Sequence, residues 1–528
     1  MNPLNEVNHQ FNFNDLFVLD IANNHQGSVD HAKLIINEHK AVVAENRIRA
    51  GVKFQFRDLP NFIHPSQQKQ SDNKHVPRFL STLLDWKDFK ALKDFVKEAG
   101  LLSICTPFDE VSVGKIIEMG FDVLKIASCS AKDWPLLEAA ADANLPILAS
   151  TGGLLIEEVD QLVSFLEHRG CDFALMHCVS IYPTPDEECN LNTISTFRKR
   201  YPNRVIGWST HENPDDTAPV QIARALGAQM YERHIGVQTA KHQLNAYSSS
   251  PSQLDKWIKA KVKADLLIGD GSRSQISSEE KQAIDGLKRG VFVSKFIQSN
   301  TDITEENTYY AFPCNPDGIS SGEWKNDFTT SLSLKKDDPI LKSYYPRSED
   351  LEQKVLKKAI HDVRARLNLT NITLSPHFTV EFSHHYGICN FNSVGTVMVN
   401  VINRQYCKKI LVQLPNQQHP LHFHKLKEET FLVLSGRLHC ELDGKEYILD
   451  PGDTLLVLPG VWHRFWSSEG AIFEEISTTA ISGDSVYRDP KINKMETVQR
   501  KTIVDHWGRF QIQEQLRNVN LPSDLVEL

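Results

Sequence analysis

Near the C-terminal end, the chain carries histidines and a carboxylate in the spacing of a metal site. His422 and His424 are separated by one residue, Glu429 follows, and His463 ends the segment PGDTLLVLPGVWH (451–463). On a strand, residues two apart point to the same face, so His422 and His424 can bind one ion together. Glu429 and His463 from neighbouring strands complete a set that suits Mn, Fe, Ni or Zn. The alternative is a domain that keeps the pattern and binds no metal.

A second group of reactive residues is spread over the first half of the chain. Lys53 and Lys125 lie inside apolar runs, where a lysine is rare unless it is paired or used. Together they would bind the phosphate and carboxylate of an anionic substrate. His211 and His234 could share one divalent ion, Mn or Mg, and leave positions open for a substrate oxygen. Structural ion pairs and buried core histidines are the alternative.

Carboxylates and hydroxyls stand beside these residues. Asp20 and Glu232 are candidates for moving protons. Hydroxyl side chains lie at or near the ends of five other apolar runs: Thr106, Ser128, Ser150, Ser180 and Ser209. Ser and Thr at strand ends often only cap the next helix, which is the alternative for each of them taken alone. Their joint placement favours one shared site.

Eight short apolar runs alternate with amphipathic stretches in the first half of the chain. The runs are Phe17–Ala22, Gly51–Phe56, Leu101–Pro107, Val123–Ser128, Pro146–Thr151, Phe173–Ser180, Val205–Thr210 and Met230–Ile235. Runs that are apolar on both faces suit a parallel sheet covered by helices. Eight of them predict a (β/α)8 (TIM) barrel, in which reactive groups lie where strands end at the C-terminal face. The alternative is a doubly wound open sheet.

The barrel domain is expected over residues 1–288, and three further parts follow it. Residues 289–345 predict a small module with short strands, and 346–375 an exposed amphipathic helical connector. From 376 to 528, short strand signals recur with turn residues between them, which predicts an antiparallel all-β barrel or sandwich. The fold class is therefore α/β followed by all-β.

The composition excludes several classes of partner. A net charge of -9 argues against nucleic acid or an anionic membrane surface, although it leaves room for a local basic pocket that binds a phosphorylated substrate. No run of about 18 apolar residues predicts a membrane span. The nine cysteines are scattered without a C-x-x-C pair, which favours a reducing cytoplasm, and Met1–Phe17 lacks the pattern of a signal peptide.

Motifs over residues 14–345 resemble, in order, those of the N-acetylneuraminate synthase family. They are DIANNHQG (20–27), VKFQ (52–55), CTPFD (105–109), LKIAS (124–128), STGG (150–153), HCVSIYPTP (177–185), GWSTHE (207–212) and YERHIGV (231–237). The resemblance implies condensation of phosphoenolpyruvate with a sugar aldehyde. It implies that His211 and His234 bind the metal and that Gln55 and Tyr182 lie near the sugar. It places phosphoenolpyruvate on Lys53, Thr106, Lys125, Ser128, Ser150 and Ser209.

The chain also departs from this family. Asp20 stands where the family usually has Glu, and the loop AKHQLNAYSSSPSQL (240–254) lacks the usual Asp. Residues 289–345 resemble the family's antifreeze-like domain, which reaches over the partner subunit's active site and supplies an Arg before a Pro. Phe312 precedes Pro313 here. A homodimer is therefore implied, while the identity of the sugar stays open.

The C-terminal pattern, with Gly436 and a Pro-Gly-Asp turn between its ligands, resembles the cupin signature. More closely, residues 376–490 resemble D-lyxose-isomerase-type cupins. That resemblance implies substrate roles for Lys427, Glu474 and Asp484 beside the metal. These groups would move protons between C1 and C2 of an open-chain sugar. A cupin that binds a sugar without turnover is the alternative.

Three functions follow from these observations. The first is a phosphoenolpyruvate-dependent synthase of a sialic-acid-like sugar acid, fused to a metal cupin that modifies a sugar of the same pathway. The second is an aldose–ketose isomerase in which the cupin activity dominates. The third is a sugar-binding protein without catalytic activity.

Overall fold

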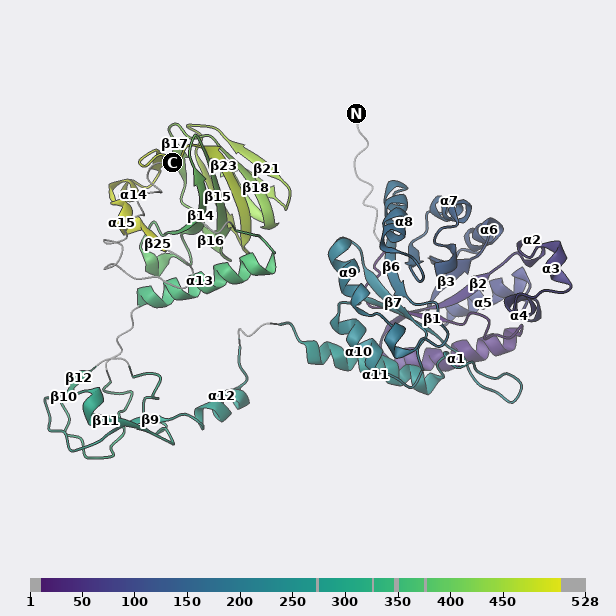
Figure 1. The fold of residues 1–528 in the computed structure, drawn as a ribbon, viewed down its shortest axis with the longest axis horizontal. Helices are drawn as coiled ribbons and strands as arrows, with labels where there is room; N and C mark the ends of the chain where they lie inside the picture. Colours follow the sequence, from purple (N-terminus) through teal and green to yellow (C-terminus); the bar gives the residue numbers. More distant parts are fainter. Residues whose placement is uncertain (1–10, 272–274, 325–326, 346–350, 375–377, 505–528) are drawn as a thin grey trace. The chain divides into compact units, whose positions relative to one another are not determined.

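The computed structural model of the protein describes residues 11–271, 275–324, 327–345, 351–374 and 378–504 (Figure 1). The chain divides into two compact units, residues 1–276 and 277–528. The domain boundaries expected at 345/346 and 375/376 fall beside residues outside the described ranges. Among the described helices, none has the length and apolar character needed to cross a bilayer.

The first unit is a closed barrel of eight parallel strands in sequence order. The strands are β1 (Leu16–Asp20), β2 (Arg49–Phe56), β3 (Leu102–Pro107), β4 (Val123–Ile126), β5 (Ile147–Ser150), β6 (Phe173–Cys178), β7 (Ile206–Thr210) and β8 (Met230–His234). Because β1 pairs with both β2 and β8, the sheet has no edge. The predicted barrel is confirmed, and the open sheet is excluded.

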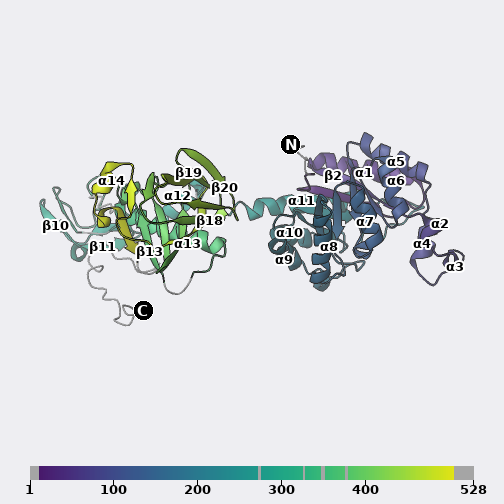
Figure 2. The ribbon, with the colours of Figure 1, turned by 90° about the horizontal axis from the view of Figure 1, so that it is seen from above.

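Helices form a ring outside the barrel strands (Figure 1). They are α1 (Val29–Asn46), α5 (Trp86–Glu98), α6 (Glu110–Met119), α7 (Trp134–Asp142), α8 (Ile156–His168), α9 (Asn192–Arg200), α10 (Ala218–Ala225) and α11 (Pro251–Ile268). Three short helices, α2 (Leu59–Phe62), α3 (Pro65–Gln68) and α4 (His75–Ser81), interrupt the connection from β2 to α5. They project from one side of the barrel in Figures 1 and 2.

The barrel contains two separate apolar clusters. One fills the interior near the N-terminal ends of the strands and includes Leu16, Val18, Ile104, Leu148 and Met176. The other lies between the strands and the helices that surround them. Inward-pointing side chains fill a barrel of this size. Because this first cluster fills the N-terminal half of the interior, the C-terminal ends of the strands remain for polar groups.

A capping aspartate ties the loops at this face together. Asp109 is the N-cap of α6, and its Oδ1 accepts a hydrogen bond from Ser112 N at 2.7 Å. Its Oδ2 accepts one from Asp58 N at 2.8 Å. The loop after β3 is thereby fixed against the loop after β2, where the three short helices begin.

The second unit begins with α12 (Ser278–Asp285) and a small module of paired short strands. β9 (Gly290–Val293) pairs with β11 (Thr308–Ala311), and β10 (Thr301–Ile303) pairs with β12 (Phe328–Thr330). An apolar cluster that includes Val291, Val293, Ile303, Ile319 and Ile340 forms its core. The module therefore has a core of its own.

The cupin region is built from two antiparallel sheets, as predicted. One has the order β21-β18-β23-β15-β14-β13-β25, and the other has the order β20-β19-β22-β17-β24, with β16 on β22. The strands are β13 (Thr379–Ser383), β14 (Thr396–Asn403), β15 (Tyr406–Gln413), β16 (Gln417–Gln418), β17 (His422–His424), β18 (Glu429–Gly436), β19 (Leu438–Leu442), β20 (Lys445–Leu449), β21 (Thr454–Val457), β22 (His463–Ser467), β23 (Ala471–Thr478), β24 (Ser485–Tyr487) and β25 (Lys501–Val504). Two short helices, α14 (Pro490–Lys494) and α15 (Thr497–Arg500), precede β25.

Helix α13 (Leu351–Leu369) occupies the segment predicted as an exposed connector, and the structure corrects that expectation. Its apolar stripe, Leu356, Ala359, Ile360, Val363 and Leu367, is buried in one cluster with Val380, Val397 and Val412 of the cupin sheet. An amphipathic helix buries its apolar face wherever a sheet offers a matching surface. α13 is therefore part of the cupin core.

Candidate active site

Two lysines and two carboxylates form a buried ion-pair network at the C-terminal face of the barrel. Lys53 Nζ lies 3.0 Å from Asp20 Oδ2 and 2.7 Å from Glu232 Oε1, and Lys125 Nζ lies 2.5 Å from Glu232 Oε2. The strand register accounts for this arrangement, because Asp20 is the partner of Lys53 on β2 and of His234 on β8. One layer of the barrel thus carries both charges and a histidine.

The pKa values in this network follow from burial and from the partners. Burial alone lowers the pKa of Lys53, but attraction to Asp20 and Glu232 outweighs it and raises that pKa above its usual value. Burial disfavours the charged form of Glu232, yet Lys125 and Lys53 hold its pKa well below the usual range. Burial lowers the pKa of Lys125 despite Glu232. A bound anion would therefore stabilise the charged form of Lys125 more than that of Lys53.

His211 and His234 lie side by side, with ring centroids 5.2 Å apart. The Nδ1 of His211 is 2.9 Å from the carbonyl oxygen of Val179, which leaves its Nε2 as the free lone pair. Burial, and then the charge of His234, lower the pKa of His211 to about 3. Burial also lowers the pKa of His234, whose buried Nδ1 lies 3.3 Å from Asp20 Oδ2 and makes no hydrogen bond of proper geometry within the described residues. Two neutral imidazoles beside Asp20 suit a divalent ion.

Hydroxyl groups surround the same space. Ser209 Oγ donates to Glu232 Oε1 at 3.0 Å, and Ser128 Oγ accepts from Gly152 N at 3.0 Å. The Thr106 hydroxyl is buried and has no hydrogen-bond partner among the described residues. A buried hydroxyl without a partner is costly unless a ligand completes it. Thr106 therefore marks a position for a ligand oxygen.

A cavity of about 670 Å³ joins these groups. Its lining includes all thirteen barrel residues predicted from the sequence: Asp20, Lys53, Gln55, Thr106, Lys125, Ser128, Ser150, Ser180, Tyr182, Ser209, His211, Glu232 and His234. Sequence reasoning missed Arg57, Lys74, Arg78 and Tyr247, which also line it. The first three belong to β2's end and the short-helix segment, for which the sequence offered no periodic signal.

Gly152 is a further residue that sequence reasoning did not single out. A Cβ at this position would lie 2.6 Å from Ser180 Oγ and 2.7 Å from Ser128 Oγ. Only a glycine lets both hydroxyls approach this backbone, and the STGG segment (150–153) supplies it.

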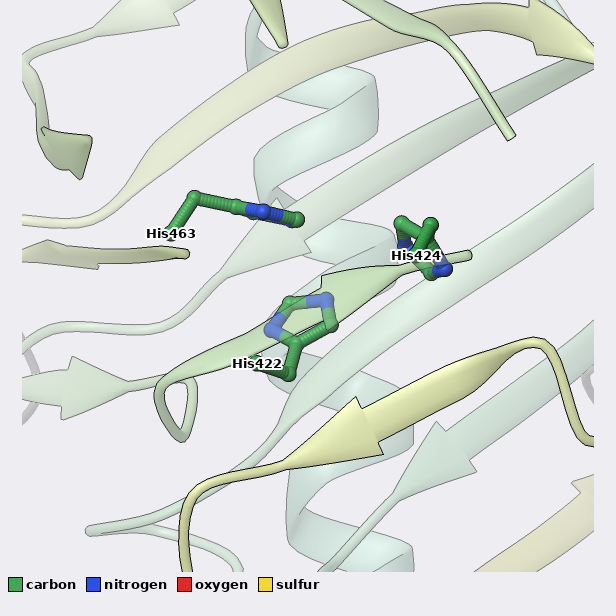
Figure 3. A group of neighbouring side chains, drawn as sticks. All are labelled: His422, His424 and His463. Carbon is green, nitrogen blue, oxygen red and sulfur yellow. The ribbon is translucent and has the colours of Figure 1, made fainter. Parts of the chain in front are cut away.

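In the cupin, three histidines face one another inside the domain (Figure 3). One ring nitrogen from each of His422, His424 and His463 lies within 4.8 Å of the others, and all three residues are buried. Glu429 comes from the opposite sheet, with Oε1 3.2 Å from His424 Nε2 and Oε2 3.2 Å from His463 Nε2. The structure therefore brings all four predicted ligands together.

Backbone carbonyls orient two of these rings. His422 Nδ1 is 3.0 Å from the carbonyl oxygen of Pro420, and His463 Nδ1 is 3.0 Å from that of Val461. Their Nε2 atoms are thereby presented to the centre as lone pairs. His463 Nε2 and Glu429 Oε2 are buried, and neither makes a hydrogen bond of proper geometry within the described part of the chain. The three imidazoles and the carboxylate are ligands that suit a metal ion, and the two buried atoms without hydrogen bonds are free to bind it.

The carboxylate beside this group is Glu475, where the sequence had pointed to Glu474. Lys427 Nζ contacts Glu429 Oε1 and lies 3.0 Å from Glu475 Oε1, which also pairs with Lys409 at 3.1 Å. Glu474 points to the other face of β23 and pairs with Lys408 at 2.5 Å. Side chains alternate along a strand, so only one of two adjacent glutamates can reach the interior.

Asp484 lies behind the ligands. Its carboxylate accepts hydrogen bonds from the backbone N–H groups of Leu426 and Lys427, at 2.9 and 3.1 Å, and its Oδ2 is 3.6 Å from His424 Nδ1. It holds the loop that carries Lys427 and so positions that lysine.

Comparison with known proteins agrees with this division of the chain. Residues 43–273 match the NeuB family, and residues 410–474 match the cupin domain family. An uncharacterized protein of Methanocaldococcus jannaschii is 30% identical over 292 residues, which cover 55% of this chain and 82% of that protein. The N-acetylneuraminate-9-phosphate synthase of Drosophila melanogaster is 35% identical over 230 residues, covering 41% of this chain and 59% of that enzyme.

A solved structure extends the likeness beyond the barrel. The putative spore coat polysaccharide biosynthesis protein E from Chromobacterium violaceum is 38% identical, with a TM-score of 0.59, and the match covers 63% of this chain and 100% of that one. On these matches and the closed barrel, the chain belongs to the NeuB family and carries a cupin domain after its NeuB part.

Proposed function

We propose that the barrel condenses phosphoenolpyruvate with a sugar aldehyde to give a 2-keto-3-deoxy sugar acid and inorganic phosphate. The observation that carries this proposal is the pair of buried lysines, Lys53 and Lys125, in one cavity with two neutral histidines. Family membership and the synthase named among the relatives support it.

Lys53 and Lys125 bind the phosphate and carboxylate of phosphoenolpyruvate, and the hydroxyls of Thr106 and Ser128 supply neutral donors beside them. Ser150 and Ser209 complete this set. His211 and His234 would hold a divalent ion, which would supply Lewis-acid polarisation of the aldehyde oxygen. Gln55 and Tyr182 line the same cavity and orient the sugar.

The bonds made and broken balance with one water molecule. The C3 carbon of phosphoenolpyruvate attacks the aldehyde carbon, and the former aldehyde oxygen takes a proton. Water adds to C2, and the C2–O bond to phosphate breaks, which leaves a ketone. Asp20 and Glu232, hydrogen-bonded to Lys53, are the carboxylates placed to accept and return these protons.

Phosphate release from phosphoenolpyruvate with a panel of aldoses and a divalent metal tests this reaction. We expect release with at least one aldose, loss of it in His211→Ala, and at least a hundred-fold lower kcat in Glu232→Gln, since proton transfer contributes about this much. Glu38→Gln on the exposed face of α1 is the matched control. Full turnover in both Asp20→Asn and Glu232→Gln would contradict the proton roles.

For the cupin we propose metal-assisted isomerisation of an open-chain sugar. The supporting observation is the buried Lys427–Glu475 pair in contact with Glu429. His422, His424, His463 and Glu429 would hold a metal, which would supply stabilisation of negative charge on the sugar oxygens. Glu475 takes the proton from the carbon next to the carbonyl and returns it to the former carbonyl carbon, while a second proton passes from the adjoining hydroxyl to the former carbonyl oxygen. Lys427 holds the Glu475 carboxylate in the orientation for this transfer.

Aldose–ketose interconversion by the full chain, in a His211→Ala background that silences the barrel, tests this second function. We expect activity that disappears in Glu475→Gln and persists in Glu474→Gln. Binding of sugar without interconversion would identify the cupin as a binding domain. The resemblance to the synthase family also supports a homodimer in the cytoplasm, which mass measurement in solution and cell fractionation test.

A further inference from the structure

Three cationic side chains at the mouth of the barrel cavity have no part in the proposed condensation. They are Arg57, Lys74 and Arg78, and they line the cavity that holds Lys53 at its floor. Lys53 and Arg57 are four residues apart on one face of the chain at β2, which separates their Cα atoms by roughly 13 Å. Gln55 lies between them on the same face. The cavity therefore carries positive charge at two separate places, at Lys53 at its inner end and at Arg57, Lys74 and Arg78 at its opening.

Arg57 is held rigidly between two aromatic rings. Its guanidinium carbon lies 4.0 Å from the ring centroid of Phe79 and 3.7 Å from that of Phe108. One Nη donates to Gln55 Oε1 at 3.0 Å, and the buried Nε has no hydrogen-bond partner in the part of the chain that the structure describes. A guanidinium fixed in this way presents a planar fork of donors, which suits a carboxylate or a phosphate.

Helix α4 adds the other two charges. Lys74, at its N-cap, and Arg78 are four residues apart, so both lie on one face of the helix and both line the cavity. Within the described ranges, no carboxylate forms an ion pair with Arg57, Lys74 or Arg78. Asp20 and Asp109 act on Arg57 electrostatically, but Asp20 is paired with Lys53 and both oxygens of Asp109 accept backbone N–H groups.

The cavity as a whole carries an excess of positive charge. Five cationic side chains, Lys53, Arg57, Lys74, Arg78 and Lys125, face two carboxylates, Asp20 and Glu232. Both carboxylates are already bonded to the floor lysines. The cations at the mouth therefore have no ion-pair partner among the described residues, and burial lowers the pKa of Arg57 to about 10.

We propose that Arg57, Lys74 and Arg78 bind a phosphate monoester at the end of the acceptor sugar remote from its aldehyde. This inference rests on the proposed condensation. Phosphoenolpyruvate occupies the floor, the aldehyde lies beside His211 and His234, and Gln55 contacts the sugar between them. A phosphate dianion matches three cationic donors better than a carboxylate does, because it offers more acceptor oxygens and more charge.

Turnover with matched acceptor pairs tests the site. The pairs are arabinose and arabinose 5-phosphate, mannose and mannose 6-phosphate, and N-acetylmannosamine and its 6-phosphate, each with phosphoenolpyruvate and metal. We expect a phosphorylated sugar to be the better substrate. Arg57→Gln and Arg78→Gln should each raise its KM by about ten-fold or more, the loss of one charge-assisted hydrogen bond. Arg57→Lys should recover part of this, and Lys87→Gln, exposed on α5, should change nothing.

Two outcomes overturn the site while leaving the condensation intact. One is equal kcat/KM for a neutral sugar and its phosphate, unchanged by Arg57→Gln and Arg78→Gln. The other is a rise of the KM for phosphoenolpyruvate alone in these variants, whichever sugar is present, which would assign the mouth to phosphoenolpyruvate.

A binding measurement separates failure of the site from failure of the reaction. Mannitol 1-phosphate has no aldehyde and cannot condense, so its binding to the metal-loaded full chain does not depend on turnover. We expect calorimetric binding that mannitol does not show and that Arg57→Gln and Arg78→Gln each weaken by about ten-fold or more. If no aldose causes phosphate release but mannitol 1-phosphate still binds, the proposed condensation is wrong and the proposed phosphate site is supported. Absence of binding to the wild-type chain overturns the site.

Discussion

At the scale of single residues, Gly152 tests whether the hydroxyls of Ser128 and Ser180 belong to the substrate site. Gly152→Ala would place a methyl group within 3 Å of both oxygens. Its backbone is not in the left-handed region, so the change acts through the hydroxyls. We expect the KM for phosphoenolpyruvate to rise about ten-fold, the loss of one or two hydrogen bonds.

Steady-state kinetics with varied phosphoenolpyruvate measures this effect. Gly114→Ala on α6 is the control, because a Cβ there meets no atom within 4 Å and alanine favours the helix. An unchanged KM in Gly152→Ala would remove Ser128 from the binding set.

The adjacent glutamates of β23 allow a second prediction at this scale. Glu475→Gln leaves the buried Lys427 and Lys409 with one charged partner fewer, and we expect it to lower the free energy of unfolding of the cupin by about 3 kcal/mol. Glu474→Gln breaks a pair with the partly exposed Lys408 and should cost less than about 1 kcal/mol. Urea denaturation, monitored by hydrogen exchange in peptides of the cupin, measures the cost of each substitution. Equal costs would contradict the assignment of faces.

The sequence predicted which residue types form each site but not every side chain that reaches it. The barrel residues could be predicted because each of these polar groups lies within an apolar run or follows it closely. On β23 the pattern misleads, since Glu475 is buried while the apolar Ile476 is 48% exposed. No alternation of apolar and polar residues can indicate a strand whose interior face carries the charge.

At the scale of elements, helix α13 is where the structure differs most from the sequence prediction. Periodicity sufficed to predict a helical connector over residues 346–375, and α13 occupies 19 residues of that segment. Which surface would receive its apolar stripe depends on strands far along the chain, from Thr379 to Val504. The short helices α2 to α4 escaped prediction for another reason: four to seven residues are too few to show a helical period.

Ile360→Ala tests the placement of α13. Ile360 is 1% exposed in the cupin core, and its truncation should lower the free energy of unfolding of that domain by about 2 to 5 kcal/mol. Leu369→Ala, at a position 82% exposed on the same helix, is the control. Hydrogen exchange should accelerate in peptides of β14 and β15 and stay unchanged in the barrel. Unchanged exchange in β14 and β15 would show that α13 does not stabilise the sheet.

At the scale of the whole molecule, two candidate metal sites lie in separate compact units. We therefore expect two divalent ions per chain, one lost in His211→Ala and the other in His422→Ala. The losses should add in the double variant, because the residues share no partners. Elemental analysis of the purified full-length variants measures this. A single substitution that empties both sites would contradict their independence.

The uneven distribution of charge in this molecule has a kinetic consequence. A chain of net charge -9 repels anions at long range, yet the barrel cavity presents five cationic side chains against two carboxylates. Low-dielectric walls concentrate the field lines of such a cavity at its opening and steer anions into it. The rate of substrate capture should therefore fall as ionic strength rises, since at about 0.15 M the field is screened within about 8 Å.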